Sequence, residues 1–261
     1  MEIRTVKAGR GWQWIKEGVA LFQKSPLHWV LFVSVLFVAI KVLLLIPLLG
    51  LVVMLAIPVL LVGMMEGCRA LEYGKPLAFG YLLSGFVRNT AALITLGGIS
   101  LAGNLLVLLV ISGIGGEAIM AVMKFAAQNK VTPENVHEIR EAASKATFSV
   151  LLGWALSIPL LMALWFAPLL AYFNDMKPLR AMQHSLAACW RNMPAFLLYG
   201  AVLFAALMLV TPISMASRML DLGLWLLAPI LIPTIYAGYK DIFDINEVAG
   251  GAPPPVESGG A

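Results

Sequence analysis

The longest apolar stretch of the chain runs from Leu27 to Met65, and the one formal charge inside it is Lys41. A membrane-spanning helix needs roughly 20 apolar residues, so this stretch has room for two. The segment Pro47-Leu48-Leu49-Gly50 divides it, because proline breaks a continuing helix. With the apolar runs that follow, spans are expected at 27–46, 48–65, 91–113, 147–173, 195–213 and 222–239. The pattern predicts an all-α fold, a polytopic membrane helix bundle with six transmembrane helices.

Two segments outside these runs separate apolar from polar residues with the period of a helix. In residues 11–24 the apolar face holds Trp12, Ile15, Val19 and Phe22, and the polar face holds Gln13, Lys16, Glu17, Gln23 and Lys24. Residues 174–193 are amphipathic in the same way. Such helices are typical of the membrane interface, where tryptophan is enriched. We therefore expect Trp12, Trp14, Phe22 and Trp190 at the interface; the alternative for 11–24 is an ordinary packed helix.

The connections differ in length. Residues 114–146 are predicted to form a helical insert on the outer side, with Gly115-Gly116 ending the third span. Thr132-Pro133-Glu134 has the composition of a helix start, and this helix is expected to run on into the fourth span. Residues 1–9 are predicted to be flexible, and the Gly- and Pro-rich residues 248–261 to form a disordered tail.

The chain also repeats one arrangement, in which an amphipathic segment and a polar pair precede a span. The pairs are Lys24-Ser25, Arg88-Asn89 and Arg191-Asn192, and Lys-Pro-Leu recurs at 75–77 and 177–179. This indicates three two-span repeats, at about 10–76, 77–176 and 177–245. Convergence of apolar sequences is the alternative. Repeats in one orientation are related by an axis along the membrane normal, so three of them would surround a central cavity.

The composition excludes an ordinary soluble domain. Only 12% of the residues are charged and 61% are hydrophobic, whereas soluble domains carry about 25% charged residues. The net charge of +4 is dispersed, without the basic run that nucleic-acid binding requires. Connections on the N-terminal side of the membrane hold 12 Lys and Arg, and those on the other side hold five. Because basic residues accumulate in cytoplasmic loops, we expect both termini in the cytoplasm.

The sequence contains no recognisable catalytic, cofactor-binding or metal-binding motif; His28, His137 and His184 are scattered. Two polar residues inside predicted spans are candidate cavity or ligand contacts. Lys41 either lines a cavity or, lying six residues before Pro47, extends its ammonium group outward to the interface. Asn104 either lines a cavity or forms hydrogen bonds between helices.

A family resemblance rests on turn-forming residues between the second and third spans. The pattern Pro58…Gly63…Glu72-Tyr73-Gly74-Lys75-Pro76…Gly85-Phe86 resembles small proteobacterial inner-membrane proteins classed as a family of unknown function. Over residues 10–247 the chain is similar to bacterial six-span membrane domains, including those attached to glycerophosphodiester phosphodiesterases. The resemblance implies a fold and a location in the bacterial inner membrane. It implies no activity.

Three classes of function remain to be compared. An accessory or organising component that acts on membrane proteins or lipids needs no catalytic group, and its partners are membrane lipids and other membrane proteins. The alternative is a transporter or channel for an apolar or lipid-like ligand, since a path for polar solutes would need more polar groups in the spans. An intramembrane enzyme is disfavoured, because no nucleophile, base or metal ligands can be grouped. We therefore expect a non-enzymatic protein without a cofactor.

Overall fold

The computed structural model describes residues 2–128, 136–217 and 222–243, and the regular elements in these ranges are all helical. They form two compact units. The first unit comprises 1–45, 60–85 and 187–261, and the second comprises 46–59 and 86–186. The expected tail at 248–261 and the helix start at 132–134 lie outside the described residues.

The helices match the predicted spans in order and approximate position. They are α1 (Arg10–Gln23), α2 (Pro26–Leu44), α3 (Pro47–Glu72), the 3-10 helix η1 (Phe79–Leu83), α4 (Ser84–Val87), α5 (Thr90–Gln128), α6 (Val136–Trp165), α7 (Ala167–Phe173), α8 (Pro178–Arg191), α9 (Met193–Ser217) and α10 (Leu222–Phe243). Among the residues that the structure describes, five segments are long and apolar enough to cross a membrane, by length and composition: Pro26–Leu44, Leu49–Glu72, Thr90–Ala127, Val136–Phe173 and Met193–Pro212. Helix α10 covers the sixth expected span but is not among these five.

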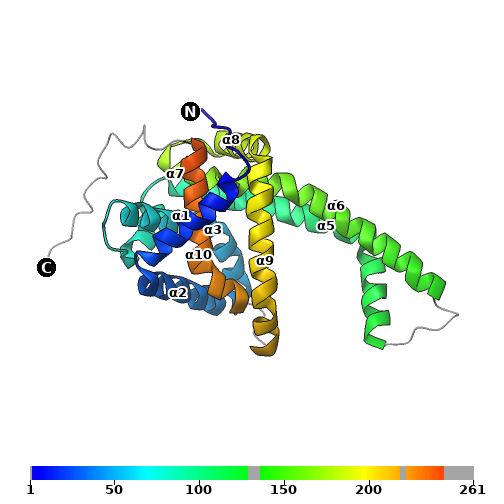
Figure 1. The fold of residues 1–261 in the computed structure, drawn as a ribbon. Helices are drawn as coiled ribbons and strands as arrows, with labels where there is room; N and C mark the ends of the chain where they lie inside the picture. Colours follow the sequence, from blue (N-terminus) through cyan, green and yellow to red (C-terminus); the bar gives the residue numbers. More distant parts are fainter. Residues whose placement is uncertain (1, 129–135, 218–221, 244–261) are drawn as a thin grey trace. The chain divides into compact units, whose positions relative to one another are not determined.

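In the first unit, α1 packs against α9 and α10, and α10 also packs against α2 and α9. Figure 1 shows α1 crossing α10. Glycine makes this crossing close, because a Cβ added at Gly18 would lie 2.7 Å from the backbone nitrogen of Thr234. The packing of α1 against α9 is equally close, since a Cβ at Gly11 would lie 3.0 Å from the backbone nitrogen of Tyr199. Small residues at such crossings allow two helix backbones to approach in a membrane protein.

Large aromatic side chains fill the first unit. Trp14 is 1% exposed and packs edge-on against Phe196 and Tyr199, with ring centroids 5.3 and 6.0 Å away. Trp29 is fully buried and meets Phe32 in the same geometry at 5.9 Å. Rings in edge-to-face contact attract each other beyond their apolar burial.

The start of α2 is only partly as expected. Pro26 occupies the first turn, where its missing N–H is not needed. Ser25 forms no side-chain cap; instead its hydroxyl lies 2.9 Å from Nδ1 of His28.

Helix α3 continues past the expected end of the second span. Gly67 and Cys68, which follow the span predicted at 48–65, are buried, and the helix runs on to Glu72. The stop comes at Gly74, whose φ of +73° favours glycine. The Lys75 N–H donates to the Ala70 carbonyl and the Gly74 N–H to the Leu71 carbonyl, which is a Schellman motif. Gly74 therefore caps the C-terminal end of α3.

The second unit is built on a hairpin of α5 and α6, which run side by side (Figure 1). The expectation that Gly115-Gly116 ends the third span is wrong, because α5 continues through both residues to Gln128. The close approach of Ser149 on α6 explains the glycine, since a Cβ at Gly115 would overlap the Ser149 side chain. As expected, α6 begins in the insert and continues into the fourth span.

The fourth span is broken near its end. Helix α6 stops at Trp165 and α7 restarts beside Pro168. The break leaves backbone groups without hydrogen-bond partners in the helix. Ser185 of α8 provides a partner for two of them. Its hydroxyl accepts a hydrogen bond from the Phe166 N–H at 2.9 Å and donates to the Met162 carbonyl at 2.7 Å.

The N-terminal segment is held in place, where flexibility was predicted for residues 1–9. The Arg4 N–H donates to the Ile242 carbonyl at 2.9 Å, and the Val6 N–H donates to Oδ1 of Asn192 at 2.7 Å. The Asn192 amide in turn donates to the Arg4 carbonyl at 3.0 Å. A fully buried amide must form such bonds, so Asn192 fixes this segment against the first unit.

The predicted orientation can be tested with single cysteines, because Cys68 and Cys189 are buried. Lys7 and Lys124 are exposed in the structure. With both termini in the cytoplasm, a membrane-impermeant maleimide should label Lys124→Cys in intact cells and Lys7→Cys only after the inner membrane is opened. The reverse labelling pattern would contradict the orientation.

The close crossing of α1 and α10 predicts that Gly18→Ala destabilises the protein. The added methyl group would meet Thr234, so the helices must separate, at a cost of about 1–3 kcal/mol. Gly200→Ala is the matched control, because it also lies in a helix and has open space around it. That control should be neutral or slightly stabilising. Thermal unfolding in detergent measures both, and an equal effect would argue against tight packing at Gly18.

Candidate functional site

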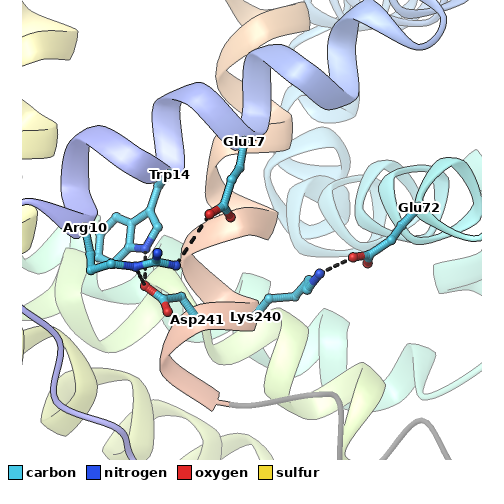
Figure 2. A network of polar contacts seen from close by, with 6 residues as sticks. All are labelled: Arg10, Trp14, Glu17, Glu72, Lys240 and Asp241. Atoms are coloured by element: carbon cyan, nitrogen blue, oxygen red, sulfur yellow. Dashed lines mark hydrogen bonds and ion pairs between the residues drawn. The ribbon is translucent and has the colours of Figure 1, made fainter.

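The most concentrated group of charges in the first unit surrounds Asp241, in the last turn of α10. Its side chain is only 7% exposed. One carboxylate oxygen accepts hydrogen bonds from Nε of Arg10 at 2.7 Å and from Nε1 of Trp14 at 2.8 Å (Figure 2). Both donors come from α1, one helical turn apart, so they reach the carboxylate from the same face. A buried carboxylate requires partners of this kind.

Arg10 also links Asp241 to the rest of α1. Its guanidinium lies 3.4 Å from the Glu17 carboxylate, in a pair whose side chains are 38% and 39% exposed. The hydrogen bond to Asp241, aided by the negative charges of Asp241 and Glu17, raises the pKa of the Arg10 guanidinium above its usual value. The pairing with Asp241 matters more than that with Glu17, because exposed ion pairs contribute little.

A second pair joins α10 to α3. The Tyr236 hydroxyl donates to the Glu72 carboxylate at 2.9 Å, and the ammonium group of Lys240 forms an ion pair with the same carboxylate. Figure 2 shows Lys240 and Asp241 side by side at the end of α10, reaching toward different helices. Adjacent residues of α10 thus bind α1 through Asp241 and α3 through Lys240.

This arrangement is a helix clamp. Each carboxylate accepts two hydrogen bonds or ion pairs from side chains of the same unit, and the two acids lie on different helix ends. Within the described ranges, no group of three or more His, Cys, Asp or Glu side chains could hold a metal ion. What the geometry does is fix the ends of α1, α3 and α10 to one another.

The second unit has its own polar contact, between the start of α5 and the turn after α7. Asn89 donates to Asp175 at 2.6 Å and to the Ala171 carbonyl at 2.9 Å, and Arg88 donates to Asp175 at 2.7 Å. The hydrogen bond from Asn89, together with Arg88, holds the pKa of Asp175 below its usual value. Asn89 and Asp175 both have positive φ, at 55° and 52°, a conformation that Asn and Asp tolerate better than most residues.

The two candidate cavity residues belong to different units and contact their own helices. Lys41 is exposed in the last turn of α2, with its ammonium group 5.4 Å from the centre of the Phe37 ring. Asn104 is exposed on α5 and donates to the Ser100 carbonyl at 2.7 Å. The alternatives for Lys41, a cavity or the interface, remain predictions. For Asn104 the hydrogen bond lies within its own helix, and the alternatives of a cavity or a contact between helices likewise remain predictions.

The four residues expected at the membrane interface differ in their exposure. Trp12 is 45% exposed on α1 and Trp190 is 71% exposed on α8, while Phe22 is half-buried. Trp14 differs from the expectation of an interface residue. Its indole is enclosed by protein, so it cannot contact lipid, and its N–H donates to Asp241. Helix α1 therefore has one packed face and one exposed face, which combines the two alternatives for 11–24.

Sequence reasoning missed the residues of the clamp. In the sequence, Arg10 contributed only to the count of basic residues that predicts the orientation. Glu72 was considered only as part of a turn, and Asp241 was not considered. The available signal was the pair Lys240-Asp241 at the end of an apolar helix, since charges next to a span must be paired or solvated. Their partners could not be inferred, because Arg10 and Asp241 are distant in the sequence.

Comparison with known proteins gives one clear relative. The chain is 30% identical to a protein of Burkholderia thailandensis named as a probable inner membrane protein, over 265 aligned residues that cover 95% of this chain and 96% of the other. No family model and no solved structure matches. The match extends over nearly the full length of both chains, so the predicted resemblance to bacterial inner-membrane proteins is confirmed.

The clamp predicts that Asp241→Asn destabilises the first unit by about 1–3 kcal/mol, because the Arg10 guanidinium and the Trp14 N–H lose the charge they bind. Glu17→Gln is the control: it removes a half-exposed partner of Arg10 and should cost less than about 1 kcal/mol. Thermal unfolding in detergent compares the two. If Glu17→Gln were the more harmful, Asp241 would not be the centre of the clamp.

Proposed function

We propose a non-catalytic role in the membrane for this chain, which belongs to the same family of inner-membrane proteins as its Burkholderia relative. The role is that of an accessory or organising component that acts on membrane proteins or lipids. The observation that carries it is the pairing of Asp241 and Glu72 with Arg10, Trp14, Tyr236 and Lys240. Charges used in this way fix helices to one another and are not offered to a substrate.

The exposed surfaces support the same role. The face of α1 that bears Trp12 stays exposed after α1 has packed, and the α5–α6 hairpin exposes large apolar residues, among them Leu109, Leu151 and Trp154 at 63–70%. Apolar surface of this extent is covered by lipid or by the apolar surface of other membrane proteins. These are the two classes of partner that we propose.

We also propose the complete six-span organisation with three repeats. It is supported by a contact that recurs at the start of the first span in the first two predicted repeats. Lys24 donates to the Leu71 carbonyl at 3.1 Å, and Asn89 to the Ala171 carbonyl at 2.9 Å, each near the end of the same repeat's second span. Asn192 reaches α10 through the backbone of Arg4.

A transporter or channel for an apolar or lipid-like ligand is the second candidate, because three such repeats would surround a cavity. Lys41 separates the two candidates. In the accessory role its ammonium group reaches the outer interface, and its charge has no ligand to bind. In the transport role it would face a cavity and bind an anionic group.

Lys41→Leu tests the proposal. We expect the variant to fold with an unchanged or slightly raised melting temperature, because it removes a charge next to hydrocarbon, and to retain the lipids and proteins that co-purify with the wild type. Lys41→Arg is the control and should behave as the wild type. Melting temperature and native mass spectrometry provide the two measurements. A folded Lys41→Leu protein that has lost a specific bound anion would favour transport instead.

A further inference from the structure

Helix α1 presents a face whose chemistry suits an anionic lipid. Its other face is fixed: Gly11, Trp14 and Gly18 are buried, and Trp14 is bonded to Asp241. The remaining face is therefore held rigidly outward. It carries Trp12, which is 45% exposed, and Lys16, whose ammonium group lies 5.8 Å from the centre of the Trp12 ring. The sequence pattern assigned these two residues to opposite faces, but they are one helical turn apart and lie on the same side of α1.

The exposed charge beside Trp12 on this face is the cation of Lys16. Lys16 is exposed and forms no ion pair with a described residue. The acids near α1 are both paired with Arg10: Asp241 is almost fully buried, and Glu17 is 39% exposed. Lys16 is therefore the cation of α1 that is available to an anionic group.

Other exposed cations belong to the same unit. The N-terminal segment that Asn192 holds carries Arg4 and Lys7, both exposed, with Glu2 as its exposed acid. Arg191 is exposed beside the exposed Trp190. Tryptophan with a neighbouring Lys or Arg suits the lipid boundary, where the ring lies at headgroup depth and the cation reaches the phosphate.

We propose that the exposed face of α1 binds the headgroup of an anionic phospholipid in the cytoplasmic leaflet, with Lys16 contacting the phosphate and Trp12 anchoring at headgroup depth. This rests on the proposed membrane role and names the lipid class and the residues. The cytoplasmic leaflet is selected because α1 lies at the N-terminal, basic side of the predicted topology. Anionic lipids of the cytoplasmic leaflet attract basic segments that lie next to the membrane surface.

The test compares lipids and variants in detergent solution. Melting temperature is measured with added phosphatidylglycerol, with phosphatidylcholine of the same chains, and with soluble glycerol phosphate. We expect phosphatidylglycerol to raise the melting temperature of the wild type more than phosphatidylcholine does, and glycerol phosphate to have no effect. Lys16→Gln should reduce the difference between the two lipids by roughly half or more. Lys124→Gln, which removes an exposed cation of the second unit, should leave that difference unchanged.

Trp12 provides an independent readout. Brominated phosphatidylglycerol in nanodiscs quenches tryptophans that lie near its bromines, and Trp12→Phe should lower the quenched fraction relative to the wild type.

Three results would overturn the inference: an equal lipid difference in Lys16→Gln and the wild type, stabilisation by glycerol phosphate alone, or unchanged quenching in Trp12→Phe. The first is also the result expected if a protein partner covers this face. None of them affects the Lys41 comparison, so the accessory role and the lipid site can fail separately.

Discussion

The first unit depends on how a carboxylate is accommodated at the end of an apolar helix. Asp241 is 7% exposed, and burial of a charge without partners is costly. Arg10 and Trp14 provide the partners, and they do so only if α1 lies across α10 at close range. Gly18 allows the two helices to approach this closely, because any larger residue would overlap Thr234. The position of α1, and with it the exposure of Trp12, follows from this one requirement.

The solvent around such a chain changes what exposure means. In water, exposed side chains such as Leu109 and Trp154 would drive aggregation, whereas in a bilayer they are already in an apolar environment. Apolar burial therefore adds little to helix association there, and specificity comes from close packing and hydrogen bonds. The contacts that distinguish this fold are of these two kinds: glycines at the crossings, and side-chain bonds at the helix ends.

The sequence predicted the helices well because hydropathy and helical period are local properties. The bounds of α1 and α2, and the stop at Gly74, follow from residues next to them. The errors arose where a contact with a segment distant in the sequence determines the local structure. Gly115 suggested a helix end, but it serves the contact with Ser149. Trp14 suggested the interface, but it bonds to Asp241. The clamp could not be predicted for the same reason, since its partners meet only in the folded unit.

The recurring contacts at the helix ends have a common physical cause. The last four carbonyls of a helix have no partner in that helix, and near hydrocarbon water is scarce. Leu71, Ala171 and Ile242 each lie in the last turn of a helix and accept a hydrogen bond from outside it. A polar residue placed just before a span can supply that donor while the apolar sequence on either side stays free to vary. Lys24 and Asn89 supply the donor from their side chains, whereas the Ile242 carbonyl receives it from the Arg4 N–H of the segment that Asn192 holds. The same requirement acts at all three helix ends, and it would favour polar residues before a span in repeated and in convergent sequences alike.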